Sequence, residues 1–176
     1  EKTTRAWYPY MRDDRGPREW NDDFHCYPYM RVRGNVAIIG CSTAVATPPF
    51  AASGYFGPRQ ARETVNLLKP AGEAGLFRVV MIHHPPIRGA TSMHKRMLGI
   101  RRFAATISSG GAELVLHGHT HLNTVHWLKG HDAQVPVVGI ASASQGQGGK
   151  KPPASFNLFS IAGNPGSWNL TRERFE

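Results

Sequence analysis

Two short apolar runs, each ending in a cluster of histidines, constrain the fold of this chain more than any other feature. The first is Phe77 to Ile82, followed by His83-His84-Pro85-Pro86, and the second is Leu114 to Leu116, followed by His117-Gly118-His119-Thr120-His121. Short apolar runs of this length are typical of buried strands. Because open α/β sheets bind ligands beyond the carboxyl ends of their strands, we expect both clusters to lie at one edge of one sheet.

The residue types in these clusters predict a metal site, since neutral imidazole is the commonest metal ligand in proteins. We predict that His83, His119 and His121 converge as ligands. Side chains of an extended segment alternate in direction, so we place His84 beside the site or toward a substrate. His117 ends its strand, and we interpret it as a supporting or structural residue. The histidines without a partner at ligand spacing are interpreted as ordinary structural residues: His25, His94, His126 and His131.

The His83-His84-Pro85 and Gly118-His119-Thr120-His121 motifs resemble the last two signature motifs of the calcineurin-like metallophosphoesterases. The resemblance implies that His83 and His119 bind one metal of a pair and that His121 binds the other. It also implies an α+β fold, a β-sandwich flanked by helices, and hydrolysis of phosphoesters by a hydroxide held at two metals. Phosphodiesters, cyclic nucleotides among them, are the expected substrates, with phosphomonoesters as an alternative, and Mn, Fe or Zn suit such a site.

The resemblance covers the whole chain but only the carboxyl-terminal half of the family's domain. The Gly-Asp-X-X-Asp and Gly-Asn-His-Asp/Glu motifs are missing, and we assign none of the Asp residues to the family's Asp-X-His motif. We therefore expect residues 1–176 to be a single partial domain that holds one sheet and part of the other. Alone, it is expected to bind at most one metal weakly and to leave phosphoesters uncleaved, with no catalytic residue beyond the metal ligands.

The charge of the chain fits a phosphate-bearing ligand. It has 21 Lys and Arg against 12 Asp and Glu, a formal net charge of +9, and a basic excess attracts anions. A different class of function, a basic non-catalytic module that binds nucleic acid or another polyanion, is the alternative. Against it, the basic residues are scattered, with only short pairs such as Arg101-Arg102 and Lys150-Lys151. The loop from Arg88 to Arg96 either contacts the substrate, with Arg88 nearest the motif, or is an ordinary solvated loop.

The two cysteines predict a reduced, cytoplasmic protein. A Gly34-Asn35 turn would place Pro28 opposite Cys41 in a hairpin, with Cys26 diagonal to Cys41 at roughly 7–8 Å. That separation is at or beyond the limit for a disulfide. The same register places Met30, Val32, Ala37 and Ile39 on the core face. No apolar run approaches the length of a membrane span.

The remaining elements follow from periodicity and turn residues. One helix is predicted from Pro58 to about Lys69-Pro70, and a second carries Ile100, Phe103 and Ile107 on one face and closes at Gly110-Gly111. Two strand pairs are predicted beyond the second histidine motif, at 122–128 with 134–140 and at 155–161 with 168–174. The Gly-rich run from Gln145 to Lys150 is interpreted as a flexible loop, because no Gly-Lys-Ser/Thr ending follows it. The amino-terminal aromatics are expected to cover a sheet edge, or else to line a cleft: Trp7, Tyr8, Tyr10 and Trp20.

Overall fold

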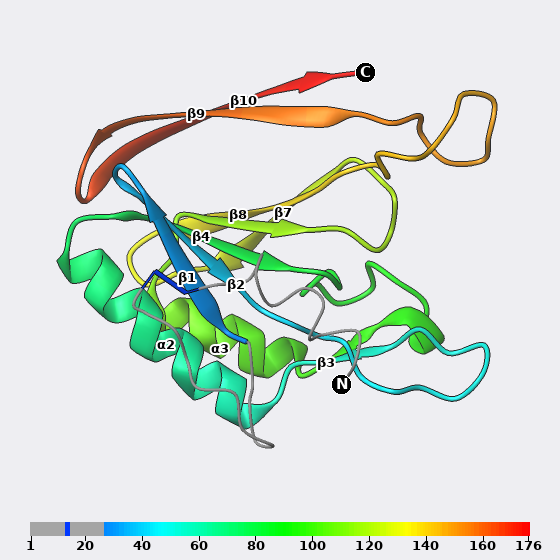
Figure 1. Cartoon of the computed structure of the whole chain (residues 1–176), viewed down its shortest axis with the longest axis horizontal. Coiled ribbons are helices and arrows are strands. Elements are labelled where there is room, and N and C mark those ends of the chain that lie inside the picture. The colour runs from blue at the N-terminus through cyan, green and yellow to red at the C-terminus, as the bar shows by residue number, and fades with distance from the viewer. Residues whose placement is uncertain (1–12, 15–26) are drawn as a thin grey trace.

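The computed structural model describes residues 13–14 and 27–176. It is a mixed α/β structure in which a multi-stranded sheet lies between two helices and a long hairpin (Figure 1). Helices α2 (Pro58–Glu73) and α3 (Ile100–Gly110) cover one face of the sheet, and the hairpin of β9 (Phe156–Asn164) and β10 (Ser167–Phe175) covers the other. The coarse expectation of a chain that combines helices with a sheet is confirmed.

The main sheet has six strands in the order β1-β2-β4-β6-β8-β7. The four inner strands are parallel, and the two edge strands pair antiparallel with their neighbours. Adjacent inner strands β4 and β6 carry the two histidine motifs, with Ile82 opposite His117, so the motifs leave the sheet side by side. The strand bounds are β1 (Tyr29–Arg33), β2 (Val36–Gly40), β4 (Phe77–Ile82), β6 (Leu114–His117), β7 (Thr124–Lys129) and β8 (Gln134–Gly139).

The first hairpin has the predicted register. Met30 pairs with Ile39 and Val32 with Ala37 around the Gly34-Asn35 turn. Ala37 and Ile39 are fully buried against the helices, together with Cys41, while Met30 and Val32 are partly buried there. Cys41 is a free thiol. The predicted position of Cys26 lies outside the described residues, as do the four amino-terminal aromatics and His25.

Helix α2 is longer than predicted. It continues through Pro70 to Glu73, whereas we expected it to end near Lys69-Pro70. The helix does not end at Pro70 because the last turn is closed by backbone bonds that do not need the missing proline N–H, such as Ala74 N–H to Pro70 O at 2.9 Å. The extra turn brings Ala71 into the core.

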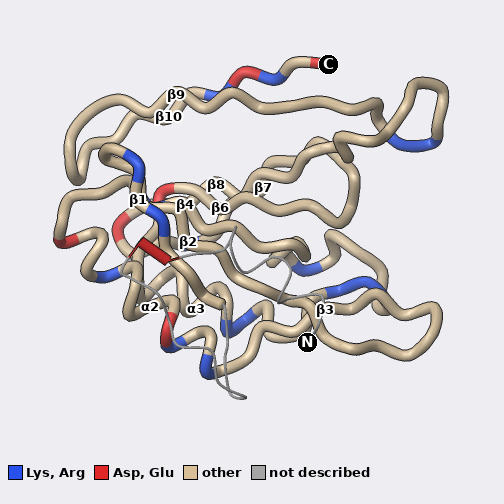
Figure 2. The backbone as a smooth tube through the Cα atoms, in the orientation of Figure 1, with Lys and Arg blue, Asp and Glu red and all other residues tan. Residues whose placement is uncertain are grey.

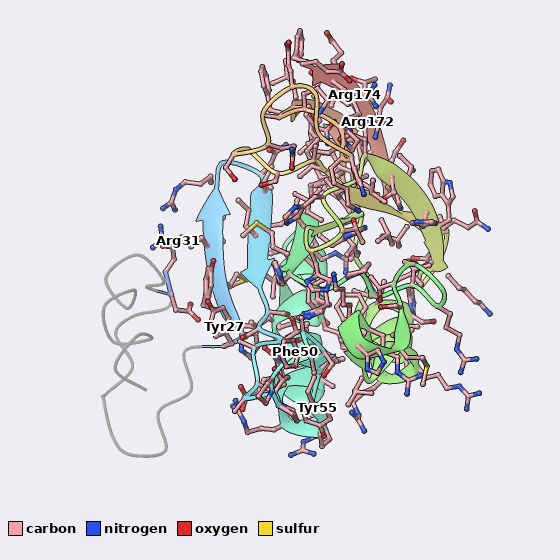
Figure 3. The ribbon with its side chains drawn as sticks, turned by 90° about the vertical axis from the view of Figure 1, so that its right-hand side faces the viewer. Tyr27, Arg31, Phe50, Tyr55, Arg172 and Arg174 are labelled. Carbon is pink, nitrogen blue, oxygen red and sulfur yellow. The ribbon has the colours of Figure 1, made fainter. Side chains whose placement is uncertain are left out.

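The second face of the sheet is covered only in part. Phe159, Ile161, Trp168 and Leu170 of the hairpin pack on it, with Trp168 edge-on to Phe77. Beside these contacts lies an open pocket of about 950 Å³, lined by residues of the hairpin, of the sheet and of the carboxyl-terminal ends of α2 and α3. Arg172 and Arg174 lie on the hairpin, at the opposite end of the molecule from Phe50 and Tyr55 (Figure 3).

Two loops add a small sheet beside the carboxyl ends of the inner strands. Strands β3 (Gly54–Tyr55) and β5 (Met97–Leu98) pair in parallel, and the short helix η2 (Met93–Lys95) precedes β5. The predicted polar loop from Arg88 to Arg96 therefore contains a helical turn. Among the described residues no helix is long and apolar enough to cross a membrane.

Candidate metal centre

The two histidine motifs meet where β4 and β6 end. Gly118 N–H donates to the carbonyl of His83 at 3.1 Å, which continues the pairing of the two strands into the loops. His83 Nε2 and His119 Nδ1 are then 3.3 Å apart. Side-chain nitrogens of His83, His84 and His119 all lie within 4.8 Å of one another, and within residues 13–14 and 27–176 this group is the one arrangement suited to a metal ion. Of the three residues predicted to converge, His83, His119 and His121, the structure brings the first two together.

The backbone at the second motif is held in an uncommon conformation. His119 and His121 both have positive φ, 66° and 55°, a left-handed region that costs most residues roughly 1–2 kcal/mol. Such strain is concentrated at functional sites. The turn also buries two polar atoms without a hydrogen-bond partner, His119 Nε2 and Thr120 Oγ1.

Burial favours the neutral form of His83 and His119, which is the form that a metal requires. Burial lowers the pKa of His119 to about 4, with further lowering by His84 and His83, although the backbone of Lys95 opposes the change in part. Burial lowers the pKa of His83 as well, followed by the charges of His84 and His121. At neutral pH these rings therefore offer lone pairs rather than positive charge.

His84 is fixed by hydrogen bonds at both ring nitrogens. Nδ1 lies 2.7 Å from Thr43 Oγ1, and Nε2 lies 2.9 Å from the carbonyl oxygen of Ala52. A carbonyl only accepts, so Nε2 carries a proton, and in the neutral ring Nδ1 then accepts from the threonine hydroxyl. The ring is buried and lies against His119, with centroids 4.1 Å apart. His84 thus supports the ring of His119, while its own lone pair is occupied.

The β3–β5 sheet positions the groups that hold His84. Ala52 N–H donates to the carbonyl of His94, and Gly54 N–H donates to the carbonyl of Arg96. Only glycine fits at position 54, since a Cβ there would lie 2.4 Å from His84 Nδ1. Sequence reasoning missed Thr43, Ala52 and Gly54, because the first two lie in loops and Gly54 lies in a two-residue strand, and such segments have no periodicity to detect.

The other predicted site residues lie apart from this group. His121 is exposed, and the structure does not bring it into the cluster of three, although its charge acts on His83. His117 is buried, with Nδ1 3.1 Å from the carbonyl oxygen of Gly118 and Nε2 3.5 Å from Thr124 Oγ1, which fits the structural role considered for it. Arg88 is exposed and has no hydrogen bond or ion pair with the part of the chain that the structure describes.

One sequence pattern was overlooked. Asp23-Phe24-His25 has the spacing of Asp-X-His, so the assignment of no Asp to that motif is wrong as a statement about the sequence. The triplet lies outside the described residues. It makes Asp23 a residue to include among the variants tested below.

The large cavity is not part of the histidine centre. It is lined by residues of the hairpin, of the sheet and of the ends of α2 and α3, among them Trp127, Val138 and Trp168, and by none of the clustered histidines. Comparison of the chain with protein-family models and with curated proteins finds no match. The fold and the site therefore define a mixed α/β protein with a candidate histidine metal centre at the carboxyl ends of two adjacent parallel strands.

Proposed function

We propose that this chain is the carboxyl-terminal part of a calcineurin-like metallophosphoesterase and that its histidine centre serves metal-dependent hydrolysis of phosphoesters. The observation that carries the proposal is the separation of 3.3 Å between His83 Nε2 and His119 Nδ1. Two nitrogens bound to one tetrahedral zinc at about 2.0–2.1 Å are about 3.4 Å apart. A hydrogen bond between the rings gives a similar separation in the metal-free chain, so a metal would replace a proton between them.

The residues of the centre fit a divalent cation in kind but fall short in number. His83 and His119 would hold one ion, and the resemblance assigns His121 to a second. A bound divalent cation would polarise a phosphoryl group and acidify water. Within the described ranges the group contains no carboxylate, and two cations at short range repel strongly without one. We therefore expect this chain to bind a single ion, weakly.

The surroundings of the centre suit an anionic substrate. The described loops that leave the sheet at this edge contain Lys and Arg residues and no Asp or Glu residue, as the blue segments of these loops in Figure 2 show. Lys95 is close enough for its charge to act on His119. The chain's own contribution would thus be to bind and orient a phosphoester, a phosphodiester or a phosphomonoester, against the metal.

Calorimetric titration with Zn²⁺ and Mn²⁺ tests the proposal directly. We expect His83→Ala and His119→Ala each to abolish metal binding, because each removes one of the two nitrogens proposed to hold the ion. His126→Ala is the matched control, since His126 lies on β7 outside the cluster. Asp23→Asn reports whether the carboxylate at that position contributes. Metal binding that survives both His83→Ala and His119→Ala would contradict the proposal.

Turnover of an aryl phosphodiester with Mn²⁺ is the second measurement. We expect none from this chain alone and metal-dependent turnover once the family's upstream motifs are supplied. Turnover by this chain alone that is abolished by His119→Ala would show a complete site and overturn the expectation of a missing half. The alternative, a polyanion-binding module, would be favoured by oligonucleotide binding with steep salt dependence that His119→Ala leaves intact.

A further inference from the structure

Lys151 lies at the histidine turn although it comes from a distant loop. Its Nζ donates to the carbonyl oxygen of Thr120 at 2.9 Å, and Thr120 stands between the two left-handed histidines of the motif. The loop between β8 and β9 that carries Lys151 is closed by Ala154 N–H, which donates to the carbonyl of Gln145 at 2.8 Å. The loop that contains the Gly-rich run, interpreted from sequence as flexible, thus brings an ammonium group to the turn between His119 and His121.

This ammonium group has capacity left for a ligand. An ammonium has three N–H donors, and the contact with Thr120 uses one. Lys151 is exposed, and it forms no ion pair with any residue in the described ranges. Lys95 lies on the other loop at this edge, close enough for its charge to act on His119, and neither loop contains an Asp or Glu residue, as the absence of red segments there in Figure 2 shows. Among the described residues, no acidic group pairs with this positive charge at the turn.

We propose that Lys151 is a substrate-binding residue that donates to a non-bridging oxygen of a phosphoryl group at the histidine centre, and that it favours a dianionic phosphomonoester over a monoanionic phosphodiester. The inference rests on the proposed function. The physical reason is that an ammonium near a terminal phosphoryl group interacts with two negative charges in the monoester and with one in the diester. Charge-assisted hydrogen bonds to phosphate are among the stronger ones in proteins.

Two substrates with one leaving group test the preference: 4-nitrophenyl phosphate, a dianion, and methyl 4-nitrophenyl phosphate, a monoanion. In the protein that carries the upstream motifs, Lys151→Met is expected to lower kcat/KM about tenfold for the dianion and clearly less for the monoanion. Lys151→Arg should retain most of the activity. Lys150→Met is the control, because it removes the same charge from the neighbouring position, where no contact with the turn exists.

A purely structural role for Lys151 gives a different result. If the residue only pins Thr120, Lys151→Met will weaken Zn²⁺ binding and lower kcat/KM for both substrates by the same factor, which would overturn the inference. We expect Zn²⁺ affinity to stay unchanged instead.

Binding of inorganic phosphate, followed by calorimetry in the chain as it stands, separates this inference from the proposed function. Weaker phosphate binding by Lys151→Met than by Lys150→Met supports the role of Lys151 even if no phosphoester is turned over. If both variants and the unmodified chain bind phosphate equally well, the role of Lys151 is overturned even if turnover of a phosphoester is found.

Discussion

The hydrogen bond between Thr43 and His84 can be removed without a change of shape. Thr43→Val replaces a hydroxyl by a methyl group of similar size, at a side chain only 1% exposed. In the unmodified protein, His84 Nδ1 accepts from Thr43 Oγ1 at 2.7 Å. The substitution leaves this nitrogen without a donor. A buried acceptor that loses its partner costs about 1–3 kcal/mol in the free energy of unfolding.

Urea denaturation measures this loss. With a slope of about 2 kcal/mol per molar urea, typical of small proteins, the midpoint should fall by about 0.5–1.5 M. Thr43→Ser is the control, since it keeps the hydroxyl and removes only a methyl group. Its stability falls by roughly 1 kcal/mol from lost packing.

The metal centre should respond differently to the two variants. His84 packs against His119, so a His84 ring that reorients after losing its hydrogen bond disturbs a proposed ligand. Zn²⁺ affinity should therefore fall in Thr43→Val and stay unchanged in Thr43→Ser. The role assigned to His84 is refuted if the free energy of unfolding of Thr43→Val lies within about 0.5 kcal/mol of that of the unmodified protein and the variant binds Zn²⁺ equally well.

Two further predictions concern the core. Burial raises the pKa of Cys41 to about 12, so in a Cys26→Ser background its alkylation at pH 8 should proceed only as fast as the protein opens, and rapid labelling of the native protein would contradict the burial. The stability that the buried neutral thiol contributes is complete below the pKa of the unfolded thiol, near 8.5. It is lost as the pH rises toward 12. Arg78 pairs with Glu113 at 2.6 Å, with side chains 16% and 21% exposed, and its guanidinium donates to the carbonyl of Gly110 at 3.0 Å. Arg78→Met should lower the free energy of unfolding by about 2–3 kcal/mol, less than for a fully buried pair, and adding Glu113→Gln should restore part of it; additive losses in this cycle would argue against the pairing.

Local sequence signals predicted the elements that carry the site. The Gly34-Asn35 turn gave the hairpin register because side chains alternate strictly along a strand, so one correct pair determines the rest. The apolar run Phe77–Ile82 became β4 with the predicted bounds. The end of α2 was missed, because whether a proline ends a helix depends on tertiary contacts beyond it, such as the burial of Ala71.

The histidine motifs predicted which residues gather but not how each is used. His83 and His119 meet because their strands are neighbours, which alternating strands and helices imply. The burial of His84 depends on Ala52 and Thr43, which reach it from 32 and 41 positions away. The same is true of Lys151 and Thr120, 31 positions apart. Contacts of this kind arise from the path of loops, for which a single sequence contains no periodic signal.

The left-handed pair His119 and His121 also bears on how quickly a ligand can enter. Their φ values of 66° and 55° set the directions of both side chains through the backbone, and the His83 carbonyl, which accepts from Gly118 N–H, holds the start of the turn. An ion arriving at such a pre-organised turn finds little conformational entropy left to remove. Association at this site should therefore be limited by the exchange of water from the ion rather than by a rearrangement of the protein.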